Sequence, residues 1–134
     1  MTSEIIYQGD LRTQATHLQS GDIILTDAPK DNHGKGEAFS PTDLVATALG
    51  SCMLSIMGII ANRHEINILG TKVSIHKIMQ TNPRRIAIIE VIMYMPNIIY
   101  TPKERTLLEN AVRTCPVSLS LHPEIEQKLS FVYQ

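Results

Sequence analysis

Two cysteines, Cys52 and Cys115, are the side chains in this sequence best suited to covalent chemistry. A thiol reacts as its thiolate, and an ordinary cysteine has a pKa of about 8.5, so a reactive cysteine needs a nearby cation. Cys52 falls in the middle of an expected helix, where the helix dipole has faded. Arg63 is on the same helix but about 16 Å further along the axis. We therefore expect an arginine from another helix or strand to be the cation that lowers the pKa of the Cys52 thiol.

Other roles for these cysteines stay open at this point. A cysteine in an apolar helix is most often a small buried hydrophobic residue. A metal site would require Cys52, Cys115 and His122 to converge with a fourth ligand, and the close-spaced pairs typical of zinc sites are missing. A permanent disulfide is disfavoured in a reducing cytosol. The GKGE segment is not a phosphate-binding loop.

Composition indicates one globular domain, residues 1–134, with 43% hydrophobic and 19% charged residues. A net charge of -1 and scattered Lys and Arg argue against a nucleic-acid or anionic-membrane partner. The N-terminus lacks the layout of a signal peptide. The longest apolar segment, Leu44 to Ala61, is interrupted by Gly, Ser and Thr, which suits a buried helix better than a membrane span. We therefore expect a cytoplasmic protein.

The N-terminal third of the chain predicts an antiparallel meander followed by a long loop. Strand-like runs cover Ser3 to Gln8, Leu11 to His17 and Asp22 to Thr26, with turn signals between them. The loop, Asp27 to Phe39, is rich in Gly, Pro, Asp and Asn. A loop of this length is either functional or simply flexible.

The clearest helix signal in the chain begins at Ser40, a good N-cap, followed by Pro41 and by Asp43 at the capping-box position. The helix is expected to run from Pro41 to about His64. Its two apolar faces consist of Leu44, Ala48, Cys52, Ile56 and Ile59/Ile60, and of Val45, Leu49, Met53 and Met57. A helix that is apolar around most of its circumference is buried on several sides, which in a small domain suggests cover by a second subunit.

The C-terminal part predicts two strands, a helix and a final strand. The strands are expected at Ile66 to Gln80 and Arg85 to Met95, the helix at Lys103 to about Thr114, a short helical turn at Val117 to Leu121 and the last strand at Gln127 to Tyr133. The order βββ-α-ββ-α-β indicates an α+β fold with helices packed on an antiparallel sheet. Cys115 either ends the second helix or caps a turn led by Pro116. The helix dipole disfavours a thiolate at the end of a helix and favours one at the start, so the two positions have opposite effects on the Cys115 thiol.

The segments FSPTDLVATALGSC and TCPVSLSLHPEI resemble the OsmC-like family, which includes osmotically inducible and organic hydroperoxide resistance proteins. The resemblance covers almost the whole chain. A Pro-led helix with a Cys 11 positions after that Pro, followed by a distant Cys-Pro, is a fairly specific combination. The family fold implies an intertwined homodimer with a long central Cys-bearing helix, flanking antiparallel sheets and active sites at the interface.

The resemblance also implies an activity. The better-studied enzymes of the family are thiol peroxidases, oxidoreductases that reduce organic hydroperoxides in the oxidative stress response. We expect no cofactor and no metal. Cys52 matches the peroxidatic cysteine, whose thiolate becomes a sulfenic acid. Cys115 matches the resolving cysteine, which would close a redox-active disulfide. A dithiol such as lipoamide, or another thiol reductant, would then restore both thiols.

The family thiolate is held by an Arg from the N-terminal hairpin, which is paired with a Glu at the start of the Cys helix. Arg12, in the stretch GDLRT, matches that Arg, whereas the position of the Glu is occupied by Thr42. Asp43 lies about 100° further round the helix and is the first candidate to replace the Glu. Glu37 in the loop is the second. This departure favours a less-characterised OsmC-like branch.

The alternative hypothesis is a binding module. A pocket lined by Leu49, Met53 and Met57 would hold an apolar ligand, and the cysteines would merely be buried. Met-rich apolar pockets adapt to varied ligands.

Overall fold

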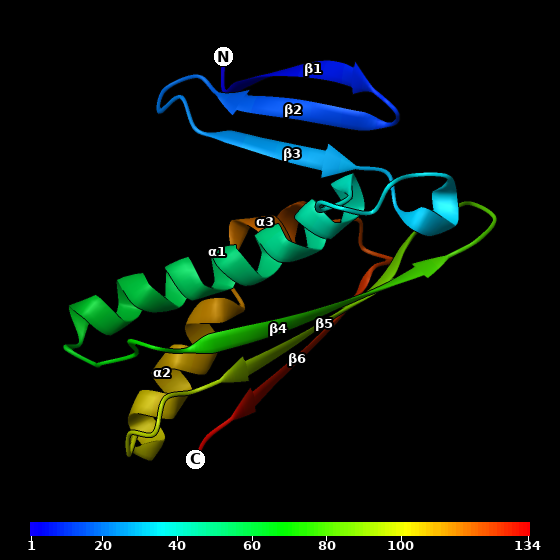
Figure 1. Ribbon diagram of the computed structural model, residues 1–134. Coiled ribbons are helices and arrows are strands. Elements are labelled where there is room, and N and C mark those ends of the chain that lie inside the picture. Colours follow the sequence, from blue (N-terminus) through cyan, green and yellow to red (C-terminus); the bar gives the residue numbers. More distant parts are fainter. The chain divides into compact units, whose positions relative to one another are not determined.

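The computed structural model describes residues 1–134, which form two compact units: unit 1, Met1–Val45, and unit 2, Ala46–Gln134. Each unit is described by itself below (Figure 1). The elements in chain order are β1 (Ser3–Gly9), β2 (Arg12–His17), β3 (Ile23–Asp27), the 3-10 turn η1 (Lys30–Asn32), α1 (Pro41–Arg63), β4 (Lys72–Gln80), β5 (Arg85–Tyr94), α2 (Pro102–Val112), α3 (Pro116–Ser120) and β6 (Glu126–Val132). The expected α+β order is confirmed.

Unit 1 is built on the three-stranded antiparallel sheet β1-β2-β3, as the meander prediction required. Gly9 occupies a positive φ of 85° where the register shifts at the β1–β2 turn, a conformation that favours glycine. The β2–β3 turn is closed by a hydrogen bond from the Gly21 N–H to the His17 carbonyl, 2.7 Å. The sheet carries exposed apolar side chains, among them Ile5, Ile6 and Ile24.

Helix α1 begins in unit 1 as the capping signal predicts. The Asp43 N–H donates to Ser40 Oγ, and the Ser40 N–H donates to Asp43 Oδ2, both at 3.0 Å. This reciprocal pair satisfies two donors that the helix itself leaves without partners. The cap therefore fixes where the Cys-bearing helix starts.

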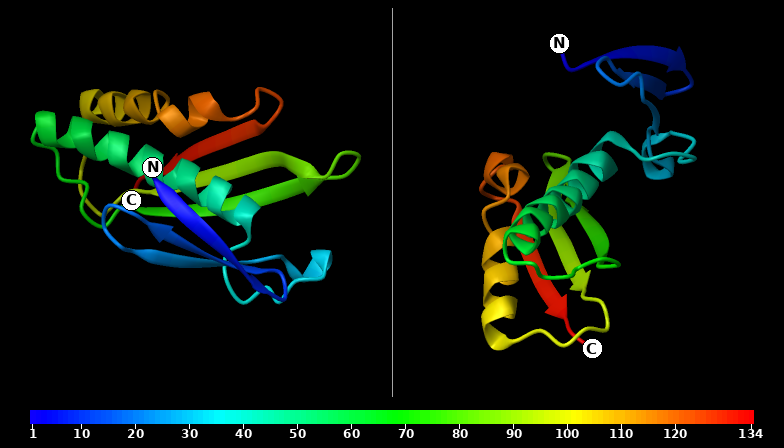
Figure 2. Two further views of the ribbon diagram at one scale, coloured as in Figure 1. Left: turned by 90° about the horizontal axis from the view of Figure 1, so that it is seen from above. Right: turned by 90° about the vertical axis from the view of Figure 1, so that its left-hand side faces the viewer.

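Unit 2 contains the sheet β4-β5-β6, with α1 and α2 on one face of it (Figure 2). The β4–β5 pair is antiparallel, but β5 and β6 are parallel, so the expectation of a purely antiparallel sheet is wrong at this pair. The chain returns from β5 through α2 and α3 before entering β6, and a helical crossover of this kind joins parallel strands. Strand β4 also begins at Lys72 rather than at Ile66.

The core of unit 2 lies between α1 and this sheet. Strand β5 alternates, and Val91 and Met93 on its inner face are fully buried. On α1, the face with Leu49, Met53 and Met57 is buried, whereas Ile59 on the other apolar face is exposed. Helix α1 is long and apolar enough to cross a membrane by length and composition, and 33% of its most apolar window is buried within the chain. It is the core helix of unit 2.

Candidate active site

Cys52 lies near the middle of α1 and is half-buried. Its neighbour Met53 points into the core, and Cys52 packs against the edge of the same cluster. Cys52 is a free thiol. The residue is therefore neither fully exposed nor fully buried, and a regular helix holds its backbone in place.

Cys115 is a free thiol with no exposed surface. Helix α2 ends at Val112, and Cys115 is the N-cap of α3, followed by Pro116. The second of the two positions left open by the sequence is therefore correct. The Leu119 N–H donates to the Cys115 carbonyl at 3.1 Å, which ties the residue to the start of α3.

The two thiols interact with each other. Burial raises the pKa of the Cys115 thiol, and a side-chain hydrogen bond with Cys52 raises it further. Hydrogen bonds from the backbone N–H groups of Ser118 and Val117 lower the pKa of Cys115, but they do not outweigh burial. Because the pKa of Cys115 is raised overall, Cys115 holds its proton at neutral pH. A buried protonated thiol beside a half-exposed one suits the roles of resolving and attacking cysteine.

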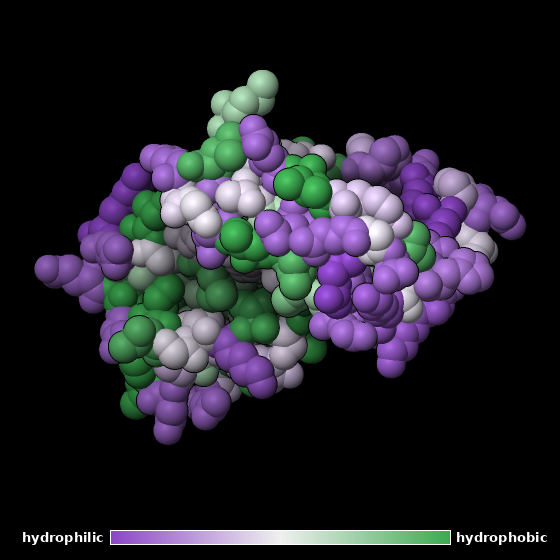
Figure 3. All heavy atoms as spheres, turned by 45° about the horizontal axis from the view of Figure 1, so that its top comes forward, coloured by the Kyte–Doolittle hydropathy of each residue, from purple (hydrophilic) through white to green (hydrophobic).

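A groove of about 500 Å³ lies between α1 and α2, close in sequence to both thiols. It starts one helical turn after Cys52, at Ile56, and reaches Thr114, the neighbour of Cys115. Its lining is formed by Ile56, Ile59, Ile60, Arg63, His64, Leu107, Asn110, Ala111 and Thr114. Figure 3 shows hydrophobic side chains gathered on one face of the molecule.

The expected ligand pocket of Leu49, Met53 and Met57 is not what the structure contains. These side chains are at most 3% exposed and belong to the core between α1 and the sheet. The helix periodicity identified them as apolar but did not say which apolar face meets the sheet. The groove uses the other face of α1.

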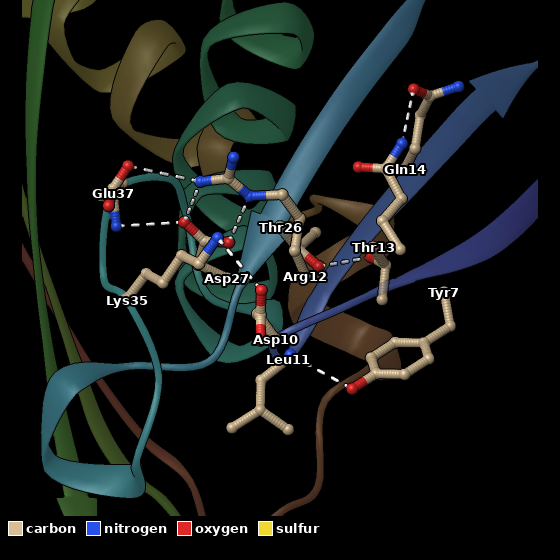
Figure 4. A network of polar contacts seen from close by, with 11 residues as sticks. Tyr7, Asp10, Leu11, Arg12, Thr13, Gln14, Thr26, Asp27, Lys35 and Glu37 are labelled. Atoms are coloured by element: carbon tan, nitrogen blue, oxygen red, sulfur yellow. Dashed lines mark hydrogen bonds and ion pairs between the residues drawn. The ribbon is translucent and has the colours of Figure 1, made fainter.

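Unit 1 contains a separate polar cluster around Arg12 (Figure 4). Arg12 on β2 is the cross-strand neighbour of Asp27 at the end of β3. Its Nε donates to Asp27 Oδ1 at 2.7 Å and its Nη2 donates to Asp27 Oδ2 at 2.8 Å. Glu37 Oε2 lies 3.6 Å from the same Nη2. Two carboxylates therefore share one guanidinium, and the bidentate partner is Asp27.

The Arg12–Asp27 pair is charged on both sides. The hydrogen bond from Arg12 holds the pKa of the Asp27 carboxyl below its ordinary range, although burial acts the other way. The same hydrogen bond raises the pKa of the Arg12 guanidinium. Asp27 also accepts the Glu37 N–H at 3.1 Å. A fully buried carboxylate is thus satisfied by one cation and one backbone donor.

The two acids expected to replace the family Glu behave differently. Glu37 contributes the second, longer ion pair to Arg12. The oxygen Oδ2 of Asp43 serves the α1 cap described above. Thr42 Oγ1 lies 3.2 Å from Ser40 Oγ in the same cap.

Sequence reasoning misses Asp27, because the residue begins the segment that is predicted to be a loop. A register argument could have found it, because Arg12 and Asp27 are equally far from the β2–β3 turn and so face each other across the hairpin. The structure thus brings Cys52 together with Cys115 in unit 2, and Arg12 together with Asp27 and Glu37 in unit 1.

Comparison with known proteins identifies the fold. A protein from Psychrobacter arcticus 273-4, provisionally described as an osmotic stress induced and detoxification response protein, matches with a TM-score of 0.94 and 50% identity over 98% of this chain and 96% of that one. An organic hydroperoxide resistance protein OsmC from Legionella pneumophila matches with a TM-score of 0.76 and 17% identity, over 98% and 96% of the two chains. The comparison with curated protein sequences found no match.

A third similar structure is that of a provisionally assigned organic hydroperoxide resistance protein from Vibrio cholerae, with captopril bound in one of its active sites. It matches with a TM-score of 0.72 and 14% identity, over 98% and 91% of the two chains.

The fold and the two interacting thiols define a class of α+β proteins with a cysteine on a long core helix. The sequence profile of the OsmC-like protein family matches residues 34–130. This chain belongs to the OsmC-like family.

Proposed function

We propose that this protein is a cysteine-dependent peroxidase that reduces organic hydroperoxides. The Cys52 thiolate attacks the terminal oxygen of ROOH, the O–O bond breaks and RO⁻ leaves, so that Cys52 becomes a sulfenic acid. The alkoxide takes up the proton that the Cys52 thiol had released and becomes ROH. The Cys115 thiol then attacks that sulfur, water leaves, and a Cys52–Cys115 disulfide forms. A dithiol reductant exchanges with the disulfide, restores both thiols and is itself oxidised.

One observation carries this proposal: the buried Cys115 is hydrogen-bonded to the half-exposed Cys52 on the core helix of an OsmC-like fold. Two thiols in hydrogen-bonding contact need only a local movement to form a disulfide. Their unequal exposure favours Cys52 for the first step, and the raised pKa of Cys115 keeps it out of that step.

Arg12 supplies the cation that keeps Cys52 as a thiolate. An arginine on the N-terminal hairpin has this task in the family that the sequence resembles. Arg12 already carries two acid partners, and it retains a further donor nitrogen, Nη1, beyond the Nε and Nη2 atoms that those acids engage.

The working form is a cytoplasmic homodimer of single-domain chains, with its active sites at the interface. Support comes from apolar surface that one copy leaves uncovered. Ile5 and Ile24 on the unit 1 sheet are exposed, and so are Val45 and Ile59 on α1. A three-stranded sheet needs a hydrophobic face to be covered before it is independently stable. A second copy of the chain would supply that cover.

The test is steady-state turnover of cumene hydroperoxide with dihydrolipoamide as the dithiol. Wild-type protein is expected to turn over, and Cys52→Ser is expected to be inactive. Cys115→Ser should consume about one equivalent and then stop, with Cys52 oxidised to sulfenic acid and beyond. Full turnover by Cys52→Ser would refute the proposal. The one thiol left in that variant is the buried Cys115, so peroxide reduction would not depend on Cys52.

The α1–α2 groove supports a second candidate function, the binding of an apolar ligand. Its volume of about 500 Å³ is within the range of small-molecule sites. Calorimetric titration with decanoic acid would test it, comparing wild type with Ile59→Glu in the groove and with Ser55→Glu, an exposed position on the same helix. Binding lost only in Ile59→Glu supports this candidate, and the absence of heat with wild-type protein rejects it.

A further inference from the structure

We infer that Gln127 on β6 holds Ser118 in place so that the Ser118 N–H can donate to the sulfur of Cys115 during disulfide exchange. The inference rests on the proposed peroxidase cycle and deepens it, because it concerns how the resolving thiol is made ready to react. Gln127 acts through Ser118, so it is a positioning residue. All three residues belong to unit 2.

Gln127 is a polar residue on a strand face that is otherwise apolar. The side chains of β6 alternate between exposed and half-buried, and the half-buried ones are Gln127, Leu129 and Phe131. Leu129 and Phe131 pack against the core of unit 2. Gln127 pairs in register with Ile89 of β5, which has no exposed surface. A polar side chain on an inner face needs hydrogen-bond partners, so the partners of Gln127 indicate what it is there to hold.

Both ends of the Gln127 amide are used on one residue, Ser118. Ser118 Oγ donates to Gln127 Oε1, and Gln127 Nε2 donates to the Ser118 carbonyl at 3.2 Å. The chain turns back between α3 and β6 (Figure 2), and these two hydrogen bonds join the two sides of that turn. Two bonds to the side chain and the backbone of Ser118 restrict both its position and its orientation.

Ser118 is in turn a direct partner of the resolving thiol. Cys115 is the N-cap of α3, and the backbone N–H groups of Ser118 and Val117 donate to its sulfur. Both donors favour the thiolate form of Cys115, whereas burial opposes it. Cys115 has no exposed surface, so water does not readily replace a donor that moves away. Displacement of the Ser118 N–H would therefore make the Cys115 thiolate harder to form.

The proposed cycle needs the Cys115 thiolate twice. In the resolving step it attacks the sulfur of the Cys52 sulfenic acid, the S–O bond breaks, and hydroxide leaves and takes up the proton that Cys115 had released. In the reducing step a thiolate of the dithiol attacks the half-exposed Cys52 sulfur, the S–S bond breaks, and Cys115 leaves as a thiolate that then takes up a proton. The second thiol of the reductant releases Cys52 and closes the reductant disulfide.

The experiment compares Gln127→Leu with a matched control, Ser120→Ala, in full-length protein. Gln127→Leu removes both hydrogen bonds to Ser118 and keeps a side chain of similar size that suits the inner face of β6. Ser120 is an exposed serine of the same short helix, and its hydroxyl donates to the Pro116 carbonyl at 2.8 Å rather than to β6. The control therefore removes a serine hydroxyl from α3 without touching the contact with Gln127.

Two quantities are measured. The first is the rate of disulfide closure after one equivalent of cumene hydroperoxide, followed by intact mass, because the sulfenic acid and the disulfide differ in mass by one water. The second is the pH midpoint of Cys115 ionisation, followed by the ultraviolet absorbance of the thiolate. It is measured in the Cys52→Ser background, where Cys115 is the only thiol.

We expect Gln127→Leu to raise the pH midpoint of Cys115 and to slow closure about 3- to 10-fold at neutral pH. The thiolate fraction falls as the pKa rises, and the greater nucleophilicity of a more basic thiolate offsets only part of that loss. The deficit should disappear above both midpoints, where Cys115 is ionised in each protein, whereas a general structural defect would persist at every pH. Ser120→Ala should leave the closure rate within about twofold. An unchanged midpoint or an unchanged closure rate in Gln127→Leu would overturn the inference.

Ser118→Ala covers the case in which Gln127→Leu does not fold. It removes the hydroxyl that Gln127 accepts but keeps the backbone N–H, so it should raise the Cys115 midpoint by less than Gln127→Leu. A midpoint equal to that of wild type would count equally against the inference.

The positioning role and the peroxidase function fail separately. If wild-type Cys52 ignores hydroperoxide while the Cys115 midpoint still depends on Gln127, the peroxidase proposal is wrong and the positioning role stands. If the disulfide closes equally fast in wild type and Gln127→Leu, the peroxidase proposal stands and the positioning role is wrong.

Discussion

The two units bury opposite kinds of side chain. In unit 2 the buried residues are apolar, from Ala46 on α1 to Cys115 before α3. In unit 1 the buried residues are Thr26, Asp27 and Ser40, all of them polar, while its isoleucines remain exposed. The hydrophobic effect therefore accounts for unit 2 by itself. Unit 1 is organised by hydrogen bonds and an ion pair, and its apolar side chains remain on the surface.

In the proposed peroxidase, the two units would meet two different requirements of thiol chemistry. A nucleophilic sulfur benefits from an apolar environment that excludes water, and unit 2 provides it. A thiolate also needs a cation, and a cation cannot be buried without an anion. In unit 1, Arg12 on β2 is paired with the buried Asp27 on the adjacent strand β3. The comparison can be tested by making similar changes in both units.

The largest effect is expected from truncating a core side chain. Leu49→Ala in unit 2 removes a fully buried side chain and should lower the free energy of unfolding by about 2–5 kcal/mol. Ile24→Ala in unit 1, where the residue is 46% exposed, should instead weaken the proposed dimer. Urea unfolding and sedimentation of both variants check this pair. Equal losses of unfolding free energy without a change in dimerisation would contradict the contrast.

An intermediate effect is expected from acid. The pKa of Asp27 is lower in the folded chain than its ordinary value, so its ion pair stabilises the fold above pH about 4 and is lost as pH falls through the lowered pKa. Asp27→Asn should therefore be less stable than wild type at neutral pH, and the difference should shrink in acid. Unfolding measured from pH 7 down to pH 2 tests this. A difference that stays constant over the whole range would count against the ion pair.

The smallest effect compares two glycines on α1. A methyl group at Gly50 would lie 2.8 Å from Cδ1 of Ile75 and 3.1 Å from Cγ1 of Val73, whereas at Gly58 it meets nothing within 4 Å. Gly58→Ala should stabilise the helix by about 1 kcal/mol. Gly50→Ala should lose that gain to overpacking and come out about 1 kcal/mol less stable than wild type. Thermal melts give the order, and the reverse order would show that α1 does not approach β4 closely at Gly50.

The sequence predicts the local features of this fold well. The capping signal at Ser40 and Asp43 correctly starts α1, and the Cys-Pro pair correctly ends the helical run of α2. These signals depend on a few neighbouring residues, which the sequence contains in full.

Features that depend on contacts between distant parts of the chain are harder to predict from the sequence. The parallel pairing of β6 with β5 follows from the crossover through α2 and α3, which periodicity does not encode. The choice of buried face on α1 depends on where the sheet lies. Asp27 was assigned to a loop because Asp is rare in strands, and only the hairpin register reveals that it faces Arg12. The contact between Cys52 and Cys115 likewise joins residues far apart in the chain, and the resemblance, not the spacing, predicted it.

The central claim is that Cys52 and Cys115 form one redox pair, and single-turnover mass spectrometry tests it most directly. Reduced protein is mixed with excess cumene hydroperoxide, and free thiols and intact mass are followed over seconds. The account predicts rapid loss of both thiols and a mass decrease of about 2 Da, for two hydrogens, that is absent in Cys52→Ser. Thiols that persist for minutes at unchanged mass would contradict it.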